Sequence, residues 1–265
     1  MRVSAWHRSE NGWHTPAEYE ELATAIVKRL SLISSIDSII TCGSLEKGDV
    51  IQGWSDLDLI VLTTSSPSPG EVQEIGHAIA SSKALLHCSI GVGLDIGSMG
   101  DLNRFYRIAG RPLMMTFEVA RYGRLRHGLD RLAKIRTLPI PLREIDYERH
   151  ILIGAEKHSW IRDYASRSNS DRVSWLFTCT KALLRILQCE IGPNMQERIN
   201  TQTALIQFQE SYPGHSHIHS LTAAVNVRSC WGHFARQASS SELESQIEDL
   251  QEAILSYPLR YSIQT

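Results

Sequence analysis

Residues 40–61 read ITCGSLEKGDVIQGWSDLDLIV, and the interpretation of the whole chain starts from this stretch. It predicts an apolar strand ending at Gly43-Ser44, a short connection, and a second apolar strand that opens with Asp56 and Asp58. Side chains at positions i and i+2 of a strand point to the same face, so the two carboxylates are expected side by side. Adjacent carboxylates are costly unless a cation neutralises them. Mg²⁺, which prefers oxygen ligands and phosphates, is the expected occupant.

Gly43 and Ser44 supply the features of a phosphate-binding turn. A glycine lets the backbone approach a ligand closely, and the serine hydroxyl and nearby N–H groups can donate to phosphate oxygens. A helix starting here would add a favourable dipole for an anion. The sequence contains no G-x-x-x-x-G-K-[ST] run, so a metal would be held by the strand aspartates rather than by a Walker-type loop. Together these features predict a site for a nucleoside triphosphate.

The order Gly-Ser, spacer, Asp-x-Asp between apolar residues resembles the signature of the DNA polymerase beta-type nucleotidyltransferase superfamily. The resemblance implies transfer of a nucleoside monophosphate from an NTP to a hydroxyl group with two Mg²⁺ ions, and Asp56 and Asp58 as ligands of both. Two plainer interpretations stay open. The aspartates could only cap turns of a hairpin, or the chain could be an inactive protein of the same fold.

The superfamily usually has a third carboxylate on a neighbouring strand. Asp95, in the apolar, glycine-bearing stretch 89–96, is the best candidate to complete the metal site and accept the proton of the attacking hydroxyl. The alternative for Asp95 is a cap on the following loop. Asp101 and then Glu118 are fallback candidates for the third ligand. Glu144 and Glu148 are alternatives for the base, because some relatives place it at the start of the second domain.

Composition limits the classes of partner. The chain has 265 residues, 42% of them apolar, and a formal net charge of −2. Without a global basic field, no long nucleic acid is expected as a partner. A local basic run between Arg121 and Arg136 is interpreted either as a phosphate contact or as an ordinary solvated face, which we favour.

Cysteine usage and hydropathy bear on location. The five cysteines show no C-x-x-C pair and are odd in number, which favours reduced thiols over a disulfide framework or a zinc site. No apolar run approaches the roughly 18–20 residues of a membrane helix, and no apolar segment follows a basic start. We therefore expect a cytoplasmic protein with no membrane partner.

The predicted fold class is α+β, with a mixed β-sheet flanked by helices and then an all-α domain. The boundary is expected at the proline-rich stretch 137–141, which gives a catalytic domain at 1–138 and a helical substrate-binding domain at 139–265. Helices are expected at 17–33 and 71–81, strands at 38–42 and 57–62, and a third strand within 84–96. Residues 114–120 are expected to be a strand or a short helix that ends in the stretch 122–128, and this segment resembles the last strand and turn of many such nucleotidyltransferase domains. The second domain is expected to be helical at 144–165, 171–189, 196–211, 221–237 and 241–256.

The two-part layout also resembles the kanamycin- and lincosamide-type antibiotic nucleotidyltransferases. The resemblance implies that the helical domain supplies basic residues to the phosphates and that the acceptor is a small hydroxylated molecule, and it allows a homodimer. Lys181 and Arg185 stand at i and i+4 of a predicted helix and so share a face. They are therefore the expected phosphate contacts, with two ordinary surface cations as the alternative.

Other features carry weaker hypotheses. His215, His217 and His219 alternate and could bind a transition metal if extended, although a solvated loop is favoured. Trp54, just before the first aspartate, could stack on a base or pack into the domain. Rival functions are a toxin-type nucleotidyltransferase acting on tRNA or protein, and a non-catalytic nucleotide-binding or antitoxin-like protein. The intact Asp-x-Asp pair argues against a pure binding protein.

Overall fold

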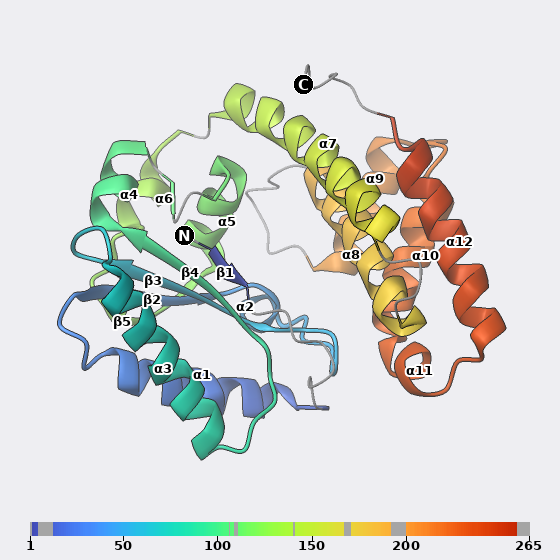
Figure 1. Ribbon diagram of the computed structural model, residues 1–265. Helices are drawn as coiled ribbons and strands as arrows, with labels where there is room; N and C mark the ends of the chain where they lie inside the picture. The colour runs from blue at the N-terminus through green and yellow to red at the C-terminus, as the bar shows by residue number, and fades with distance from the viewer. Residues whose placement is uncertain are drawn as a thin grey trace. The chain divides into compact units, whose positions relative to one another are not determined.

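The computed structural model describes residues 2–4, 13–105, 107–108, 111–139, 141–166, 171–191 and 200–258. The chain divides into two compact units, Met1–Ile140 and Pro141–Thr265. In Figure 1 the first unit runs from blue to green and the second from yellow-green to red. The first unit holds all strands among the described residues, and the second is helical. The predicted α+β class is therefore confirmed.

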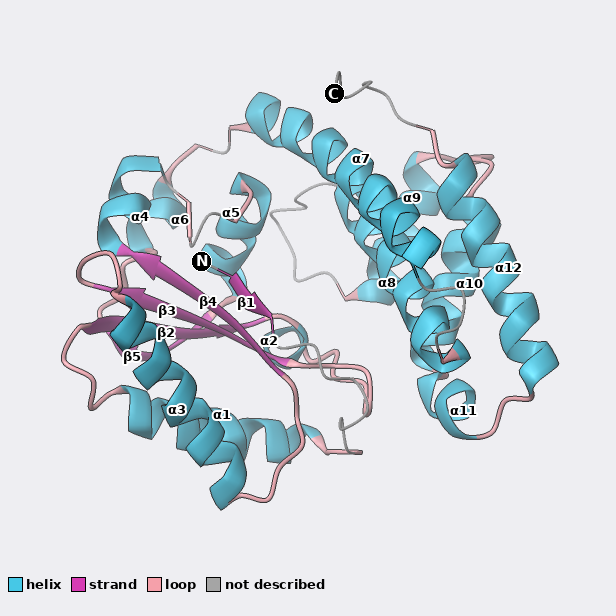
Figure 2. Cartoon of the chain, in the orientation of Figure 1, coloured by secondary structure: helices cyan, strands magenta, loops and turns pink. Residues whose placement is uncertain are grey.

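The first unit is built on a five-stranded mixed sheet in the order β1-β4-β3-β2-β5 (Figure 2). The strands are β1 (Arg2–Ser4), β2 (Ile36–Cys42), β3 (Leu57–Thr63), β4 (Val92–Ser98) and β5 (Arg124–Gly128). Strands β3 and β4 are parallel, and the other neighbours are antiparallel. The sequence did not predict the short edge strand β1, and it did not resolve that β4 begins only at Val92.

Helices α1 (Pro16–Leu30) and α3 (Pro69–Leu85) cover one face of the sheet, where they lie side by side (Figure 1). Alternate residues of β3 (Leu57, Leu59 and Val61) point into this layer and are fully buried. Strand alternation explains the pattern, because every second side chain of a strand faces the same side. This layer is the apolar core of the first unit, and burial of such side chains stabilises the fold by about 1.5–3 kcal/mol each.

Each of these two helices follows a residue whose side chain caps the backbone of its first turn. The Thr15 hydroxyl accepts the Glu18 N–H, and the Glu18 carboxylate accepts the Thr15 N–H in return. Ser68 and Glu71 form the same reciprocal pair before α3. Each helix also has a proline in its first turn, where a missing N–H costs nothing. The helix expected at 17–33 is confirmed, although it begins at Pro16 and ends at Leu30 rather than at residue 33.

The opposite face of the sheet carries α5 (Leu113–Tyr122), which settles the open choice for residues 114–120 in favour of a helix. A methyl group built on Gly123, where α5 ends, would lie 2.9 Å from Ile40 Cγ2. The end of α5 therefore packs against β2, on the face away from α1 and α3. The remaining short helices of this unit are α2 (Ser44–Lys47), α4 (Met99–Phe105) and α6 (Ala133–Thr137).

The second unit consists of helices in its described residues. They are α7 (Leu142–Ser166), α8 (Arg172–Ile191), α9 (Thr201–Ser211), α10 (Ile218–Ser229), α11 (Trp231–Arg236) and α12 (Ser240–Ser256). Helix α8 is central, because α7, α9, α10 and α12 all pack against it. One local prediction was wrong, because the expected helix at 221–237 breaks at Cys230. Helix α12 begins at Ser240, one residue before the predicted start, and the Ser239 hydroxyl caps it by accepting the Glu242 N–H. The predicted start of α9 at residue 196 lies outside the described residues.

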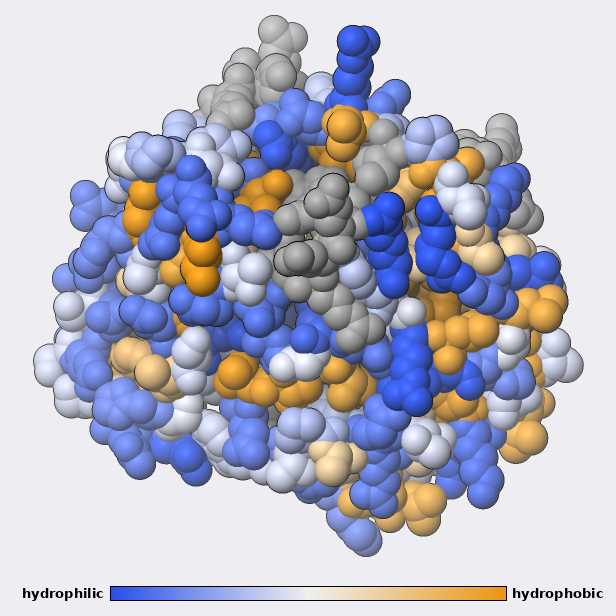
Figure 3. Space-filling view, turned by 180° about the vertical axis from the view of Figure 1, so that it is seen from behind, coloured by the Kyte–Doolittle hydropathy of each residue, from blue (hydrophilic) through white to orange (hydrophobic). Residues whose placement is uncertain are grey.

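The surface is mixed in character. Figure 3 shows hydrophilic side chains over much of one face, with apolar patches between them. Among the described residues, no helix combines the length and the apolar character needed to cross a bilayer.

Candidate active site

The ends of three neighbouring strands bring the predicted residues together. In the register of the sheet, Asp58 of β3 is paired with Cys42 of β2 on one side and with Gly93 of β4 on the other. Asp95 follows two residues later on β4, where it is paired with Ile60. Because side chains alternate along a strand, Asp58 and Asp95 lie on the same face, opposite the apolar core.

Two glycines make room for the aspartate carboxylates. A methyl group built on Gly43 would lie only 2.0 Å from Asp58 Oδ2. One built on Gly93 would lie 2.8 Å from Asp58 Oδ1 and 3.6 Å from Asp56 Oδ2. Both carboxylates therefore converge on Gly93, although Asp56 precedes the first residue of β3. Any side chain at either glycine would occupy the space in front of the carboxylates.

The turn after β2 brings Gly43 against Asp58, and Ser44 follows it directly. Gly43 adopts a φ of 70°, a conformation that side-chain-bearing residues rarely adopt, and its carbonyl accepts the Lys47 N–H at 3.1 Å. Ser44 is the first residue of the four-residue helix α2 and is half-buried. Glycine and serine thus sit at the strand end where the sequence predicted a phosphate-binding turn.

Asp56 is held by hydrogen bonds to the residues on either side of it. The Tyr19 hydroxyl, from α1, donates to the Ser55 carbonyl at 2.6 Å, and the Leu57 N–H donates to the Gly91 carbonyl at 2.8 Å. Burial, and then the charge of Asp56, raises the pKa of Tyr19. The loop before β3 is therefore fixed to α1 and to the entry of β4, and Asp56 is positioned by elements far apart in the sequence.

Asp95, the predicted third ligand, forms an ion pair with Arg111. The guanidinium Nε lies 2.5 Å from Asp95 Oδ2, and Nη2 contacts the same oxygen. The Asp95 side chain is only 3% exposed, while that of Arg111 is 17% exposed. Sequence reasoning missed Arg111, because neither its spacing nor its neighbours in the chain link it to the motif.

A second, half-buried ion pair lies on the same side of the sheet. Lys47, the last residue of α2, pairs with Glu118 of α5. Burial pulls the pKa of Lys47 down, but the charge and hydrogen bond of Glu118 outweigh it and leave the pKa above its ordinary value. Glu118, a fallback candidate for the third ligand, is therefore paired with Lys47, which follows the Gly43-Ser44 turn.

Cys42 marks the centre of this charged region. Burial, and next the charge of Asp58, raises the pKa of its thiol, with Arg111 acting in the opposite direction. The thiol is therefore neutral and behaves as a small apolar side chain near these charged groups. Its charged surroundings place Asp58, Arg111 and Glu118 in one electrostatic environment.

The donor chemistry of the site fits a hard divalent cation. Asp56 and Asp58 present oxygen ligands toward one point, which is the donor type that Mg²⁺ prefers. Within the described ranges, no three acidic, histidine or cysteine side chains converge in an arrangement that holds a metal. Two protein carboxylates are enough for Mg²⁺, which usually completes its coordination shell with water and substrate phosphates.

The basic run is mostly neutralised by the first unit's own carboxylates. Arg131 contacts Asp37 through Nε at 2.9 Å and Nη2 at 2.6 Å, and Arg136 pairs with Asp130. Arg126 is shared among Glu20, Glu46 and Thr41, and Arg124 also contacts Glu20. The network around Arg126 fixes α2 to α1 and β5. These contacts favour the structural interpretation of the run.

The two predicted phosphate cations of the second unit lie on α8. Lys181 Nζ lies 5.4 Å from the centre of the Phe177 ring, a cation–π distance, and Arg185 Nη1 donates to Glu156 Oε1 of α7 at 2.7 Å. Their assignment to a phosphate stays a prediction. Glu144 is exposed and Glu148 half-buried, both in the first two turns of α7. Asp101 lies in the first turn of α4, where its backbone N–H donates a hydrogen bond to Ser98 Oγ at 3.1 Å.

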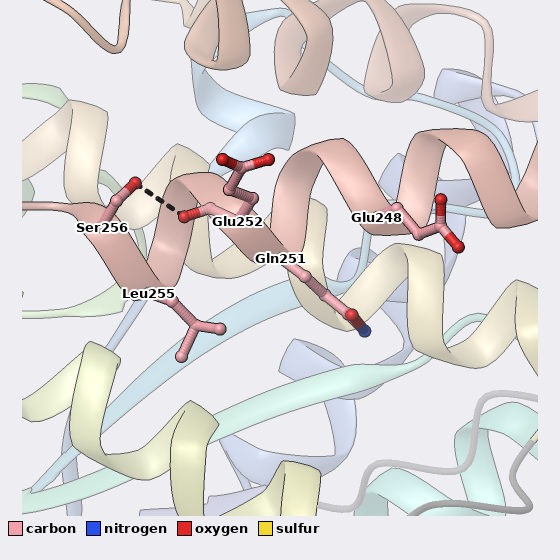
Figure 4. A pocket seen from close by; sticks show the side chains of 5 residues that line it. All are labelled: Glu248, Gln251, Glu252, Leu255 and Ser256. Carbon is pink, nitrogen blue, oxygen red and sulfur yellow. Dashed lines mark hydrogen bonds between the residues drawn. The ribbon is translucent and has the colours of Figure 1, made fainter.

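The structure also shows the surroundings of Trp54 and of the alternating histidines. Trp54 is buried, which agrees with packing into the domain. His215 and His217 form an aromatic cluster with Tyr257, with His217 and Tyr257 ring centres 4.9 Å apart. A hollow on the surface of α12 is lined by Glu248, Gln251, Glu252, Leu255 and Ser256 (Figure 4). It lies on one helix and contains none of the predicted site residues.

The mixed sheet, the flanking helices and the helical second unit together form the fold of a nucleotidyltransferase. Among solved structures, the chain is similar to spectinomycin adenyltransferase AAD(9) from Enterococcus faecialis, crystallised with ATP and spectinomycin. The TM-score is 0.54 and the identity 13%, over 91% of this chain and 99% of that chain. A likeness at this identity shows the fold. No protein-family model matches the sequence, and no curated protein matches it.

Proposed function

We propose that this protein is a Mg²⁺-dependent nucleotidyltransferase that moves a nucleoside monophosphate from an NTP to a hydroxyl group of a small molecule. The observation that carries the proposal is the convergence of Asp56 and Asp58 at Gly93, beside the Gly43-Ser44 turn. The likeness in fold to an adenyltransferase crystallised with ATP and an antibiotic supports the same conclusion.

The roles of the residues follow from their chemistry. Asp56 and Asp58 would hold Mg²⁺, two ions in the full site, and the bound metal would neutralise the triphosphate and activate the acceptor hydroxyl. Gly43 keeps the backbone close to the phosphates, and the Ser44 hydroxyl donates to a phosphate oxygen. The acceptor oxygen forms a bond to the α-phosphorus while the bond to the β-phosphate oxygen breaks. Pyrophosphate leaves, and the hydroxyl proton passes to a base.

A small hydroxylated acceptor is preferred over RNA. The net charge of the chain is −2, and the arginines at 124, 126, 131 and 136 are paired with carboxylates of the same unit. Nucleic-acid binding relies on cations that are available to phosphates. The acceptor class we propose is an aminoglycoside, a lincosamide, an aminocyclitol such as spectinomycin, or another sugar-bearing compound.

The test is label transfer from each α-labelled NTP with Mg²⁺, in the presence of a pool of these antibiotics and, separately, of a cell extract. We expect label in a small molecule, together with pyrophosphate, and about a thousandfold less transfer by the Asp58→Asn variant. Label in RNA or protein would show that the acceptor is a macromolecule, and the proposed nucleotidyl transfer would still hold. Nucleotide binding without pyrophosphate release under all conditions would point to a non-catalytic binding protein.

A further inference from the structure

The ion pair between Asp95 and Arg111 gives these residues roles that the motif does not suggest. We propose that Arg111 binds phosphate groups of the nucleotide and that Asp95 positions Arg111 rather than binding the metal. The proposal rests on the proposed nucleotidyltransferase function and assigns the phosphate contact to the first unit itself.

The contact leaves part of the guanidinium for a ligand. Nε and Nη2 both engage Asp95 Oδ2, so one edge of the planar group faces the carboxylate. Within the described part of the chain, Nη1 donates to no other group. The Arg111 side chain is 17% exposed and that of Asp95 only 3%, so solvent reaches the cation more readily than the carboxylate. An incoming ligand would therefore meet the guanidinium more readily than the carboxylate.

The pair lies beside the proposed metal ligands. Asp95 is two residues from Gly93, which is paired with Asp58 and faces both aspartate carboxylates. The charge of Asp58 also acts on Arg111. Phosphate oxygens that bind a cation held by Asp56 and Asp58 would thus lie near the guanidinium as well.

The backbone of Arg111 is fixed on both sides. Its N–H donates to the Ile108 carbonyl at 2.8 Å, and its carbonyl accepts a hydrogen bond from Arg107 Nη1 at 3.4 Å. The Ile108 N–H in turn donates to Thr116 Oγ1 of α5 at 3.2 Å. A side chain presented from an anchored backbone and oriented by a buried carboxylate loses little freedom on binding, which favours its use for recognition.

Physical chemistry favours this role over a metal-binding role for Asp95. A metal at Asp95 Oδ2 would displace Arg111 and leave a largely buried guanidinium without its partner, and Asp95 Oδ1 is buried away from solvent. Arginine, by contrast, is suited to phosphate, because its planar set of donors matches phosphate oxygens in pairs. The pair can therefore bind the nucleotide without breaking, whereas a metal at Asp95 Oδ2 would break it.

Metal binding separates the two roles without any assay of turnover. Binding of Mn²⁺ alone, measured by the loss of the free-ion electron paramagnetic resonance signal, would be compared for wild type, Asp58→Asn and Asp95→Asn. We expect Asp58→Asn to weaken binding at least tenfold and Asp95→Asn to change it less than threefold. Equal losses in the two variants would make Asp95 a metal ligand and overturn the proposal.

Nucleotide binding without metal tests Arg111 directly. In EDTA, the affinity for the NTP that binds wild type best would be measured for Arg111→Ala and for the matched control Arg131→Ala, which also removes an Arg–Asp pair of the same unit. We expect at least a tenfold loss for Arg111→Ala, a smaller loss for Asp95→Asn, and none for Arg131→Ala. Equal affinities of wild type and Arg111→Ala would leave the ion pair a purely structural role.

Folding is checked by circular dichroism and thermal unfolding. If Arg111→Ala does not fold, Arg111→Lys is used instead, because it keeps the charge and loses the planar donor set. A severalfold loss of nucleotide affinity in Arg111→Lys supports the proposal. Wild-type affinity in that variant contradicts it. If wild type transfers label yet these variants behave as wild type, only the further inference fails. If wild type binds neither Mn²⁺ nor any NTP, the proposed function itself fails.

Discussion

The two faces of the sheet in the first unit contain side chains from the same strands and serve different ends. On the face covered by α1 and α3, β3 contributes Leu57, Leu59 and Val61, all fully buried in the apolar core. On the other face, the same strand presents Asp58 next to Asp95, Arg111 and Lys47. Strand alternation lets adjacent residues take part separately in stability and in chemistry. The comparison predicts that mutations one residue apart have separable effects.

The largest expected effect is on Asp58 compared with Leu59. Asp58→Asn should lower transfer by about a thousandfold, the upper range for removing one preorganised charge-stabilising group, and keep the free energy of unfolding near that of wild type. Leu59→Ala should lower the free energy of unfolding by about 2–5 kcal/mol, because it leaves a cavity in the core. Turnover and urea unfolding of both variants measure the separation. Wild-type turnover in Asp58→Asn would contradict the metal assignment.

The next effect compares two glycines of one turn. Gly43 and Gly48 both adopt positive φ angles, 70° and 66°, so alanine strains the backbone at either position. A methyl group at Gly43 would lie 2.0 Å from Asp58 Oδ2, whereas nothing lies within 4 Å at Gly48. Gly43→Ala should therefore reduce transfer by about a hundredfold more than Gly48→Ala, in the range for removal of one charge-stabilising group. Similar activities of the two variants would show that the carboxylate tolerates displacement.

A smaller effect is expected for the hydrogen bond that joins the two faces. Tyr19 belongs to the core layer, yet its hydroxyl donates to the Ser55 carbonyl at 2.6 Å, just before Asp56. Tyr19→Phe should lower the free energy of unfolding by about 1–3 kcal/mol, because it leaves a buried carbonyl without its donor. It should also reduce transfer severalfold through the loosened Asp56. Chemical denaturation and steady-state rates check the two parts, and an unchanged rate would show that Asp56 is positioned without this bond.

The smallest effect concerns pH and the cap of α1. The Thr15 N–H, followed by hydrogen bonds from His14 and the Thr15 hydroxyl, lowers the pKa of Glu18 from 4.5 to about 2. A carboxylate with a lowered pKa contributes stability that is fully present above pH 4.5 and is lost as the pH falls toward 2. Between these values, the free energy of unfolding should fall less steeply for Glu18→Gln than for wild type. Parallel pH curves would contradict the role of the cap.

Much of the fold could be predicted from local patterns. Apolar runs located β2 and β3, and periodic apolar positions located α1 and the helices of the second unit. The open choice at residues 114–120 and the break at Cys230 depend on packing, which local propensity does not contain. The short strand β1 exists only because β4 offers a partner, so three residues gave no pattern to recognise.

The candidate site shows the same division more sharply. Gly43, Ser44, Asp56 and Asp58 are close in the sequence, and their spacing alone indicated a phosphate and cation site. The sequence did not link Arg111 to the motif and offered Glu118 only as a fallback metal ligand, because their contacts with Asp95 and Lys47 cross from one element to another. The sequence also predicted Asp95 as a third ligand, and the structure places an arginine in front of it.

The sequence by itself determined the α+β class, the two aspartates, and the Gly-Ser turn before them, because these features depend on residues near each other along the chain. Only the tertiary structure decided which polar groups meet: Arg111 with Asp95, Lys47 with Glu118, and the Tyr19 hydroxyl with the Ser55 carbonyl before Asp56. The physical reason is that a buried charge requires a partner, and the fold brings that partner from a distant segment.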